Sequence, residues 1–287
     1  MKKEPKTDLK RLQENEIEIL DEIVRICDQH KLEYFLVGGT CLGAIRHKGF
    51  IPWDDDIDIA MPREDYEKFI EIAIEELDDR YFIQCNQTDP EYYLGFIKIR
   101  KNNTTFILKH EFNSDSHQGF FVDIFPLDYT DNINSLSLRI NITLAKNLTE
   151  TMLYKKKYKK FKELRHPIIS SIGLPFNIQQ LQRTVNNLMQ KQNKKEHIYT
   201  GSFAGAYHYK KDSFPMDKVF PASLVEFEGK KYKTFNEPKW YLEHLYGDYM
   251  KLPPIEKRVS HNPSKLLFDK GKNYISKEKY QEAQGEK

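Results

Sequence analysis

Four aspartates lie between residues 54 and 58, and their spacing makes them the residues best suited to chemistry. Asp54, Asp55 and Asp56 are consecutive, and Asp58 follows within the apolar run at 57–60. This run predicts a short strand in which alternate side chains share a face, so we expect the carboxylates of Asp56 and Asp58 on the same side, about 7 Å apart. Two carboxylates this close repel each other unless a cation lies between them. Mg²⁺ prefers such oxygen ligands and usually completes its coordination with substrate phosphates.

A glycine pair precedes the acidic segment. The apolar run at 34–37 ends at Gly38 and Gly39, which predicts a strand followed by a tight turn. Thr40 is expected to cap a short helix that continues to Arg46. Glycines let backbone N–H groups approach a phosphate closely, and the N-terminal end of the following helix adds a positive potential. The pair therefore predicts a phosphate-binding turn.

A third acidic position lies further along the chain. Asp123 interrupts the apolar run at 120–125, which Pro126 closes, and a carboxylate in a buried strand implies a cation or a basic partner. Each feature also has an ordinary explanation. A glycine pair is usually only a turn, an acidic cluster is usually a solvated loop or a helix cap, and a single buried aspartate usually pairs with arginine. Their occurrence together and in this order favours a functional site.

These segments resemble the signature of the LicD family, bacterial phosphocholine transferases that are related to fukutin and the fukutin-related proteins and belong to the nucleotidyltransferase-fold superfamily. The matching stretches are GGTCLGAIRHKGFIPWDDDIDIAMPREDYEKF at 38–69, GFIKIRKNNT at 95–104, GFFVDIFPLD at 119–128 and, more weakly, FEGKKY to YGDYMKLPP at 227–254. The resemblance covers most of the chain except the segment around 131–200.

The resemblance implies an α+β fold with a nucleotidyltransferase-like mixed sheet flanked by helices, and a metal-dependent reaction. Asp56, Asp58 and Asp123 would be the catalytic residues and the ligands of Mg²⁺ or Mn²⁺. Asp123 is also our first choice for the base that takes the acceptor proton, with Asp54 and Asp55 as alternatives. The implied reaction moves phosphocholine, or a similar phospho-alcohol, from CDP-choline or another CDP-alcohol to a sugar hydroxyl and releases CMP. The acceptor would be a cell-surface glycan or teichoic acid precursor, free or lipid-linked.

Substrate binding is expected from the glycine turn and from basic residues that fall near the acids in the motif order. Each of these basic residues has an alternative interpretation, in which it pairs with a structural carboxylate or lies at the surface. The candidates are Gly38, Gly39, Thr40, Arg46, His47, Lys98 and Arg100.

The apolar periodicity predicts alternating helices and strands. Helices are expected at 9–30, 40–46, 63–77, 178–192 and 238–245, and strands at 34–37, 56–60, 81–85, 93–100, 104–109, 120–125, 224–227 and 232–235. We expect a nucleotidyltransferase-like catalytic core at 1–130. A helical, basic insertion would follow at 131–200, and residues 201–287 would complete the same catalytic domain.

A long helix-like segment ends in a basic run at 155–165, where seven of eleven residues are Lys or Arg. It is either a solvated helix face, a peripheral membrane contact through 154–165, or a surface that attracts a phosphate-rich acceptor. Nucleic acid is not expected as a partner, because no nucleic-acid-binding motif accompanies the charge and the net charge of the chain is only +2.

The composition fits a globular protein, with 39% hydrophobic and 31% charged residues. Three cysteines without CxxC spacing indicate reduced thiols, so a cytoplasmic location is expected, with contact at the inner face of the membrane if 154–165 binds lipid. Two other functions remain open. A glycosyltransferase with an Asp-x-Asp motif would need a longer nucleotide-binding parallel sheet before its acids. A non-catalytic glycan- or lipid-binding protein would not need the three acids.

Overall fold

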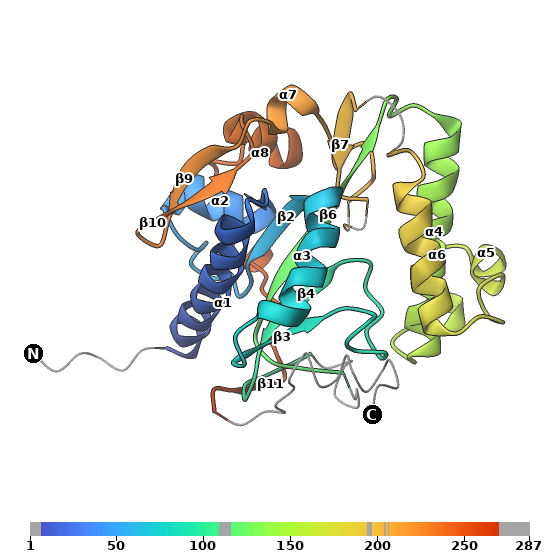
Figure 1. Cartoon of the computed structure of the whole chain (residues 1–287), viewed down its shortest axis with the longest axis horizontal. Helices are drawn as coiled ribbons and strands as arrows, with labels where there is room; N and C mark the ends of the chain where they lie inside the picture. Colours follow the sequence, from blue (N-terminus) through green and yellow to red (C-terminus); the bar gives the residue numbers. More distant parts are fainter. Residues whose placement is uncertain (1–6, 109–115, 194–196, 204, 206, 270–287) are drawn as a thin grey trace, which may run out of the picture.

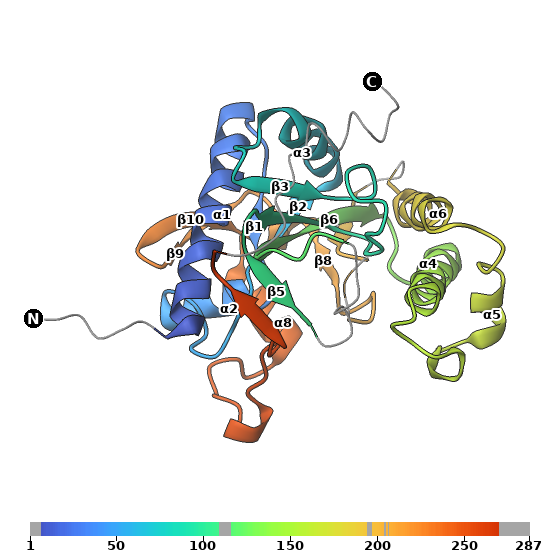
Figure 2. The same cartoon turned by 90° about the horizontal axis from the view of Figure 1, so that it is seen from below.

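The computed structural model describes residues 7–108, 116–193, 197–203, 205 and 207–269. Within them the chain forms a nine-stranded mixed sheet with helices packed around it, which confirms the predicted α+β class (Figure 1). The strand order is β3-β4-β6-β2-β1-β10-β9, with β7 joined to β6 and β8 joined to β7. Strands β5 and β11 form a separate antiparallel pair, seen in green and red in Figure 2.

The helices lie mostly where the periodicity predicts them. They are α1 Asp8–His30, α2 Gly38–His47, α3 Arg63–Glu76, α4 Leu136–Lys155, α5 Pro167–Ser171, α6 Ile178–Gln190, α7 Met216–Val219 and α8 Pro238–Tyr246, with 3-10 turns η2 Phe161–Glu163 and η3 Ile255–Lys257. The strands are β1 Phe35–Leu36, β2 Asp58–Pro62, β3 Tyr81–Gln84, β4 Ile97–Lys101, β5 Thr105–Ile107, β6 Phe121–Thr130, β7 Tyr199–Gly201, β8 Ser213–Pro215, β9 Ser223–Phe227, β10 Lys230–Thr234 and β11 Lys265–Leu267.

The central strands bury both faces of the sheet. Side chains alternate along a strand, so Leu36 and Ile59 join the apolar core of α1 and α3, whereas Phe35 and Ala60 join the core of α8. Helices α1 and α3 accordingly lie on one side of the sheet, and α2 and α8 lie on the other (Figure 2). This double cover explains why the central strands are nearly continuous apolar runs.

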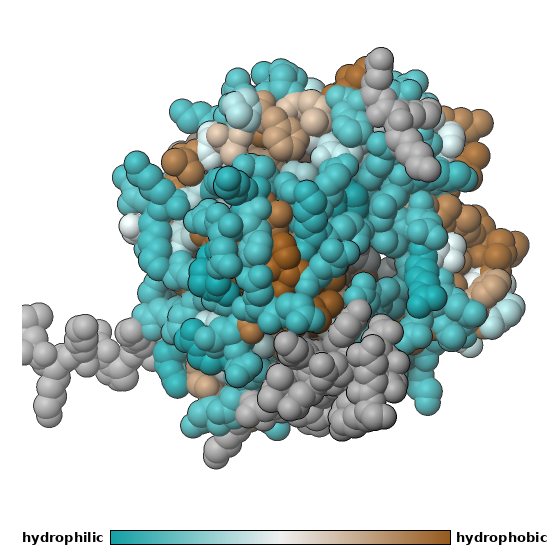
Figure 3. Space-filling view, in the orientation of Figure 1, coloured by the Kyte–Doolittle hydropathy of each residue, from teal (hydrophilic) through white to brown (hydrophobic). Residues whose placement is uncertain are grey.

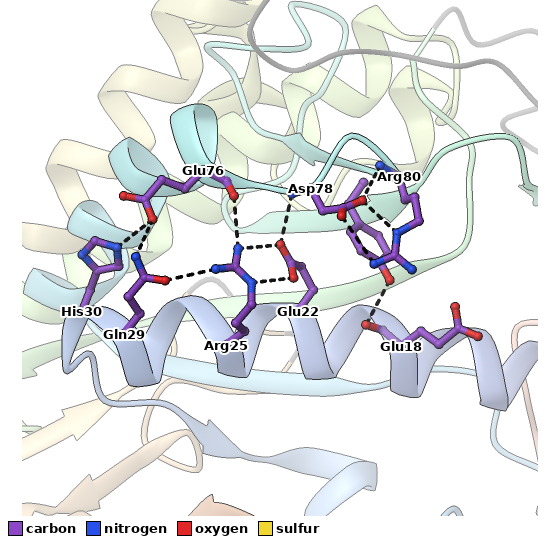
Figure 4. Close-up of polar contacts among 9 residues, drawn as sticks. Glu18, Glu22, Arg25, Gln29, His30, Glu76, Asp78 and Arg80 are labelled. Atoms are coloured by element: carbon purple, nitrogen blue, oxygen red, sulfur yellow. Dashed lines mark hydrogen bonds and ion pairs between the residues drawn. The ribbon is translucent and has the colours of Figure 1, made fainter.

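A polar seam fixes α1 against the end of α3 (Figure 4). Arg25 donates to both carboxylate oxygens of Glu22, at 2.8 Å each, and to the main-chain carbonyl of Glu76 at 3.1 Å. His30 contacts the Glu76 carboxylate at 2.9 Å. The seam holds the helix that carries Glu16 in a defined place over the sheet.

The predicted ends of two strands near the acids differ from those in the structure. Strand β2 begins at Asp58, so Asp56 precedes the strand and is not part of it. Strand β6 continues through Pro126 to Thr130, although proline lacks an N–H. The Asp123 N–H points to β2, and alternate residues of a strand face alternate neighbours. Pro126 therefore faces β4, whose pairing stops at Ile124, and no ladder bond is lost.

Other boundaries also differ from the predictions. The predicted strand at 93–100 begins only at Ile97, and residue 109, at the end of another predicted strand, lies outside the described residues. Helix α4 ends at Lys155, so the basic run is not a helix. Lys157 has a left-handed φ of 62°, which stops the helix there, and turns and η2 follow.

The predicted insertion contains α4, α5 and α6, which lie together at one end of the molecule (Figure 1). Strands β7 to β10, from residues 199–234, belong to the same sheet as β1, β2, β3, β4 and β6. The domain boundaries at 130 and 200 stay a prediction. Within the described residues, no helix combines the length and hydropathy needed to cross a membrane. The three cysteines are buried and form no disulfide.

Candidate active site

Two of the three predicted catalytic acids meet at the centre of the sheet. Strands β2 and β6 are parallel, and their register places Asp58 directly beside Asp123. On the other side of β6, Lys98 of β4 lies opposite Asp123, and its ammonium forms an ion pair with the Asp123 carboxylate. The Lys98 nitrogen also lies 3.6 Å from the centroid of the Phe121 ring. The predicted basic partner of Asp123 is therefore Lys98.

The glycine pair lies against the carboxylates. Gly38 opens α2 with a left-handed φ of 57°, and a Cβ on it would come within 2.9 Å of an Asp58 carboxylate oxygen. A Cβ on Gly39 would come equally close to Asp54. The two glycines are required because the acids approach the backbone of the turn. The Gly38 N–H donates to the hydroxyl of Tyr241 at 2.8 Å.

Thr40 does not cap α2, contrary to the prediction. The helix starts two residues earlier, at Gly38, and Val37 is its N-cap without a side-chain hydrogen bond. The Thr40 hydroxyl instead accepts the main-chain N–H of Asp58 at 2.8 Å. It fixes the first residue of β2 beside the turn. Whether Thr40 also binds substrate stays a prediction.

The segment before β2 is held from two sides. The Gln13 side chain of α1 donates to the main-chain carbonyl of Asp54 at 3.0 Å. The Asp55 carboxylate accepts the main-chain N–H of His261 at 2.9 Å and lies 3.0 Å from its Nδ1. The same Nδ1 lies 3.9 Å from an Asp56 oxygen. The site thus includes a residue from the C-terminal part of the chain that the sequence analysis did not identify.

Burial and mutual repulsion favour protonation of these acids. Withdrawal from water raises the pKa of Asp58 well above its usual value, and the charges of Asp56 and Asp123 raise it further. Burial, followed by the charges of Asp56 and Asp55, raises the pKa of Asp54 to about 8. Burial also raises the pKa of Asp56, which the positive charge of His261 opposes. Such a cluster needs either protons or a cation to be stable.

The residues present fit a divalent cation. Asp55, Asp56 and His261 each offer a ligand atom, and these atoms lie within 4.8 Å of one another. Asp58 and Asp123 lie beside each other in the adjacent strands. Within the described residues, ligand atoms within 4.8 Å of one another are found for Asp55, Asp56 and His261 and not for the predicted set Asp56, Asp58 and Asp123, whose binding of a cation stays a prediction. Carboxylate oxygens suit Mg²⁺ and Mn²⁺.

The other predicted basic residues make contacts with groups other than the acids. Arg46 donates to His47 at 2.8 Å and to the carbonyl of Tyr249 at 2.8 Å, at the far end of α2. Eight residues of helix separate Arg46 from Gly38, or about 12 Å of rise. Arg100 is buried and donates to Gln84 and to the carbonyl of Gly119. The structure does not bring Arg46 and His47 to the acids, and their binding roles stay predictions.

A cavity of about 580 Å³ opens beside the start of β4. Its walls include Tyr66, Tyr92 and Phe96, together with Gln182 and Arg183 of α6. The hydroxyl of Tyr92 and the side-chain oxygen of Gln182 are buried and have no hydrogen-bond partner in the described part of the chain. The cavity has the size of a small-molecule site.

The fold and the site together define an α+β protein whose central sheet carries a cluster of carboxylates suited to a divalent cation. Residues 31–170 match the family model described as LicD/FKTN/FKRP, nucleotidyltransferase domain. The match covers 140 of the 287 residues and supports a place for this chain in that family.

Three relatives are similar to this chain. Lipopolysaccharide cholinephosphotransferase LicD of Haemophilus influenzae is 29% identical over 249 residues, which cover 86% of this chain and 92% of that protein. Uncharacterized protein RP689 of Rickettsia prowazekii is 26% identical over 38% of this chain and 44% of its own length. Uncharacterized protein RT0683 of Rickettsia typhi is 36% identical over 19% of this chain and 18% of its own length.

Proposed function

We propose that this protein transfers phosphocholine, or a similar phospho-alcohol, from a CDP-linked donor to a sugar hydroxyl of a cell-surface glycan precursor and releases CMP. The observation that carries the proposal is the pairing of Asp58 with Asp123 across two parallel strands, directly against the Gly38 turn. The likeness to a lipopolysaccharide cholinephosphotransferase along most of both chains supports the choice of substrate class.

The proposed roles follow from charge and position. A divalent cation, Mg²⁺ or Mn²⁺, would neutralise the diphosphate of the donor and the leaving CMP. Asp56, Asp58 and Asp123 would hold the cation. The Gly38–Gly39 turn at the start of α2 would bind a phosphate through backbone N–H groups, and Lys98 would add a positive charge beside Asp123. The cavity, whose lining includes Phe96 and Ile97 just before Lys98, would offer space for the donor.

The decisive experiment incubates the protein with Mg²⁺, a glycan acceptor and a panel of donors, and measures the release of CMP. We expect release from CDP-choline or another CDP-alcohol, and none from sugar nucleotides. Asp56→Asn, Asp58→Asn and Asp123→Asn should each lower the rate at least about 100-fold, because each removes a charged ligand of the cation. The matched control is Asp217→Asn, which changes an exposed aspartate of α7 and should keep the full rate.

Two results would contradict the proposal. Full CMP release by any of the three variants would show that the acids do not bind the reacting phosphates. Release of a nucleotide from a sugar nucleotide alone would instead favour the glycosyltransferase. That alternative is disfavoured because, within the described residues, only the two-residue strand β1 precedes the acids. Tight glycan binding without turnover of any donor would favour the non-catalytic binding protein.

We also propose that the segment 154–176 contacts an anionic membrane, where a lipid-linked acceptor would lie. Large apolar side chains of this segment are exposed, including Ile168 at 86% and Ile172 at 60%, and they form the brown area over α5 in Figure 3. Lys157, Lys160 and Lys162 are exposed next to them in the chain. Apolar residues beside lysines are typical of a surface that binds the membrane interface.

We place the protein in the cytoplasm as part of the same proposal. Its three cysteines are free thiols in the structure, which suits a reducing compartment.

A further inference from the structure

Glu16 of α1 is a buried carboxylate without a partner. Its side chain is 0% exposed, and neither oxygen has a hydrogen-bond partner within the described residues. Buried carboxylates are normally paired or bound to metal, because an uncompensated charge inside a protein is very costly. Within the described residues nothing balances a charge on Glu16, so the carboxyl needs either a proton or a cation.

Glu16 faces the segment of aspartates before β2. After burial, the charges of Asp56, Asp55 and Asp54, in that order, are the largest causes that raise the pKa of Glu16. One turn earlier on the same helix, Gln13 donates to the main-chain carbonyl of Asp54 at 3.0 Å. The face of α1 that carries Gln13 and Glu16 thus covers this segment.

His261, from the C-terminal part of the chain, contacts the same segment. Its Nδ1 lies 3.0 Å from Asp55 and 3.9 Å from Asp56, and the three residues offer ligand atoms within 4.8 Å of one another. Asp55 is itself buried. Asp55, Asp56 and His261 therefore offer ligand atoms at one place, and the buried Glu16 lies on the face of α1 that covers the same segment.

We propose that Asp55, Asp56 and His261, with Glu16 from α1, bind a second divalent cation. This site shares Asp56 with the catalytic cation site at Asp56, Asp58 and Asp123, but the inference does not rest on the transfer reaction. An imidazole nitrogen among carboxylates suits Mn²⁺ or Zn²⁺ better than Mg²⁺. The cation would join α1 to the C-terminal segment through the acids and would fix Asp56 for its role in the catalytic site.

The site is tested by counting bound ions. Metal-free protein is titrated with Mn²⁺, and free Mn²⁺ is measured by electron paramagnetic resonance. We expect two ions per wild-type chain. His261→Gln and Glu16→Gln should weaken the binding of one ion about tenfold or more, which is the usual effect of losing a supporting ligand. Asp123→Asn should weaken the other ion and keep this one, so the failure of one site can be distinguished from the failure of the other.

A thermal measurement separates ligation from a purely structural role of Glu16. In metal-free protein, Glu16→Gln should keep or raise the melting temperature, because it replaces a buried carboxyl that must either take up a proton or carry an unpaired charge. Saturating Mn²⁺ should raise the melting temperature of the wild type more than that of this variant. The matched control is Glu18→Gln, which changes an exposed glutamate of the same helix and should behave as wild type in both measurements.

The proposal is overturned if the wild type binds no Mn²⁺, or binds a single Mn²⁺ that Asp123→Asn weakens and His261→Gln does not. It is equally overturned if Glu16→Gln and His261→Gln bind Mn²⁺ as the wild type does, since Glu16 would then be a protonated core residue and His261 only a hydrogen-bond partner of Asp55. A lower melting temperature of metal-free Glu16→Gln would also contradict it.

Discussion

At Gly38, two separate requirements for glycine meet in one residue. Its φ of 57° lies in the left-handed region, and the Asp58 carboxylate occupies the space that a side chain would need. Gly229, in the hairpin between β9 and β10, has a similar φ of 79° but no atom within 4 Å of a built Cβ. A comparison of Gly38 with Gly229 therefore distinguishes the effect of backbone strain from the effect of the contact with Asp58.

We predict that Gly38→Ala destabilises the protein more than Gly229→Ala does. Backbone strain alone should cost each variant about 1–2 kcal/mol. The Gly38 variant should lose more than this and should also lose metal binding, because Asp58 must move. Chemical denaturation and Mn²⁺ titration measure both effects. Equal losses of stability with intact Mn²⁺ binding in both variants would mean that the approach of Asp58 to the turn is unimportant.

The residues of the site differ in how visible they are in the sequence. Asp58 and Asp123 are detectable because each is a carboxylate within an apolar run. Glu16 carries a weaker signal: it lies in the apolar stripe of α1, four residues after Leu12 and four before Leu20, where a polar residue is out of place. His261 carries none, because it lies in a polar segment and reaches Asp55 only through the tertiary fold.

At the scale of elements, a buried ion pair connects α3 to β6. Arg63, the first residue of α3, donates two hydrogen bonds to the Asp128 carboxylate, at 2.8 Å and 2.6 Å. Both side chains are almost completely buried. The pair fixes α3, the helix that follows β2, to β6, the strand that carries Asp123. It therefore helps to hold the two strands of the site in place.

We predict that Asp128→Asn lowers the free energy of unfolding by about 3–5 kcal/mol, because it leaves the buried Arg63 charge with only the half-exposed Glu67 as an ion-pair partner within the described residues. The control is Asp78→Asn, which removes an exposed ion pair with Arg80 and should cost less than about 1 kcal/mol. Urea denaturation of the two variants gives the comparison. Similar small losses would contradict the structural importance of the buried pair.

Element boundaries were predicted less well than the elements themselves. The apolar periodicity located α1, α3, α6 and the β9–β10 hairpin, because each buries one face. It could not show that β2 starts at Asp58. The spacing of Asp56 and Asp58 is the same whether the strand includes both residues or only Asp58. It also predicted that the strand β6 ends before Pro126, because proline has no N–H to donate. The sequence does not show that this position of β6 faces no hydrogen-bonded neighbour, so the strand can continue.

At the scale of the whole molecule, the proposed membrane surface can be tested directly. We predict that the double variant Ile168→Ser and Ile172→Ser binds vesicles of anionic phosphatidylglycerol about 100-fold or more weakly than wild type, because each isoleucine that enters the membrane interface contributes about 1.5–3 kcal/mol. Binding of the wild type should fall with added salt and should be weak on phosphatidylcholine, since lysines contribute through anionic lipid. Vesicle sedimentation measures all of these.

The matched control for the membrane prediction changes apolar residues elsewhere. Ile255→Ser and Val259→Ser replace side chains that are 77% and 72% exposed in the C-terminal part. This variant should bind vesicles as wild type does. If it loses as much binding as the first variant, or if neither loses any, the segment 154–176 is not the membrane contact.

The sheet order has a consequence for synthesis on the ribosome. Leu36 of β1 pairs with Thr234 of β10, 198 residues later in the chain. At about 5–20 residues per second, the nascent protein carries β1 without this neighbour for on the order of ten seconds or more. An open strand edge of that duration invites pairing with other chains. Production of this protein should therefore benefit from slower translation at low temperature or from co-expressed chaperones.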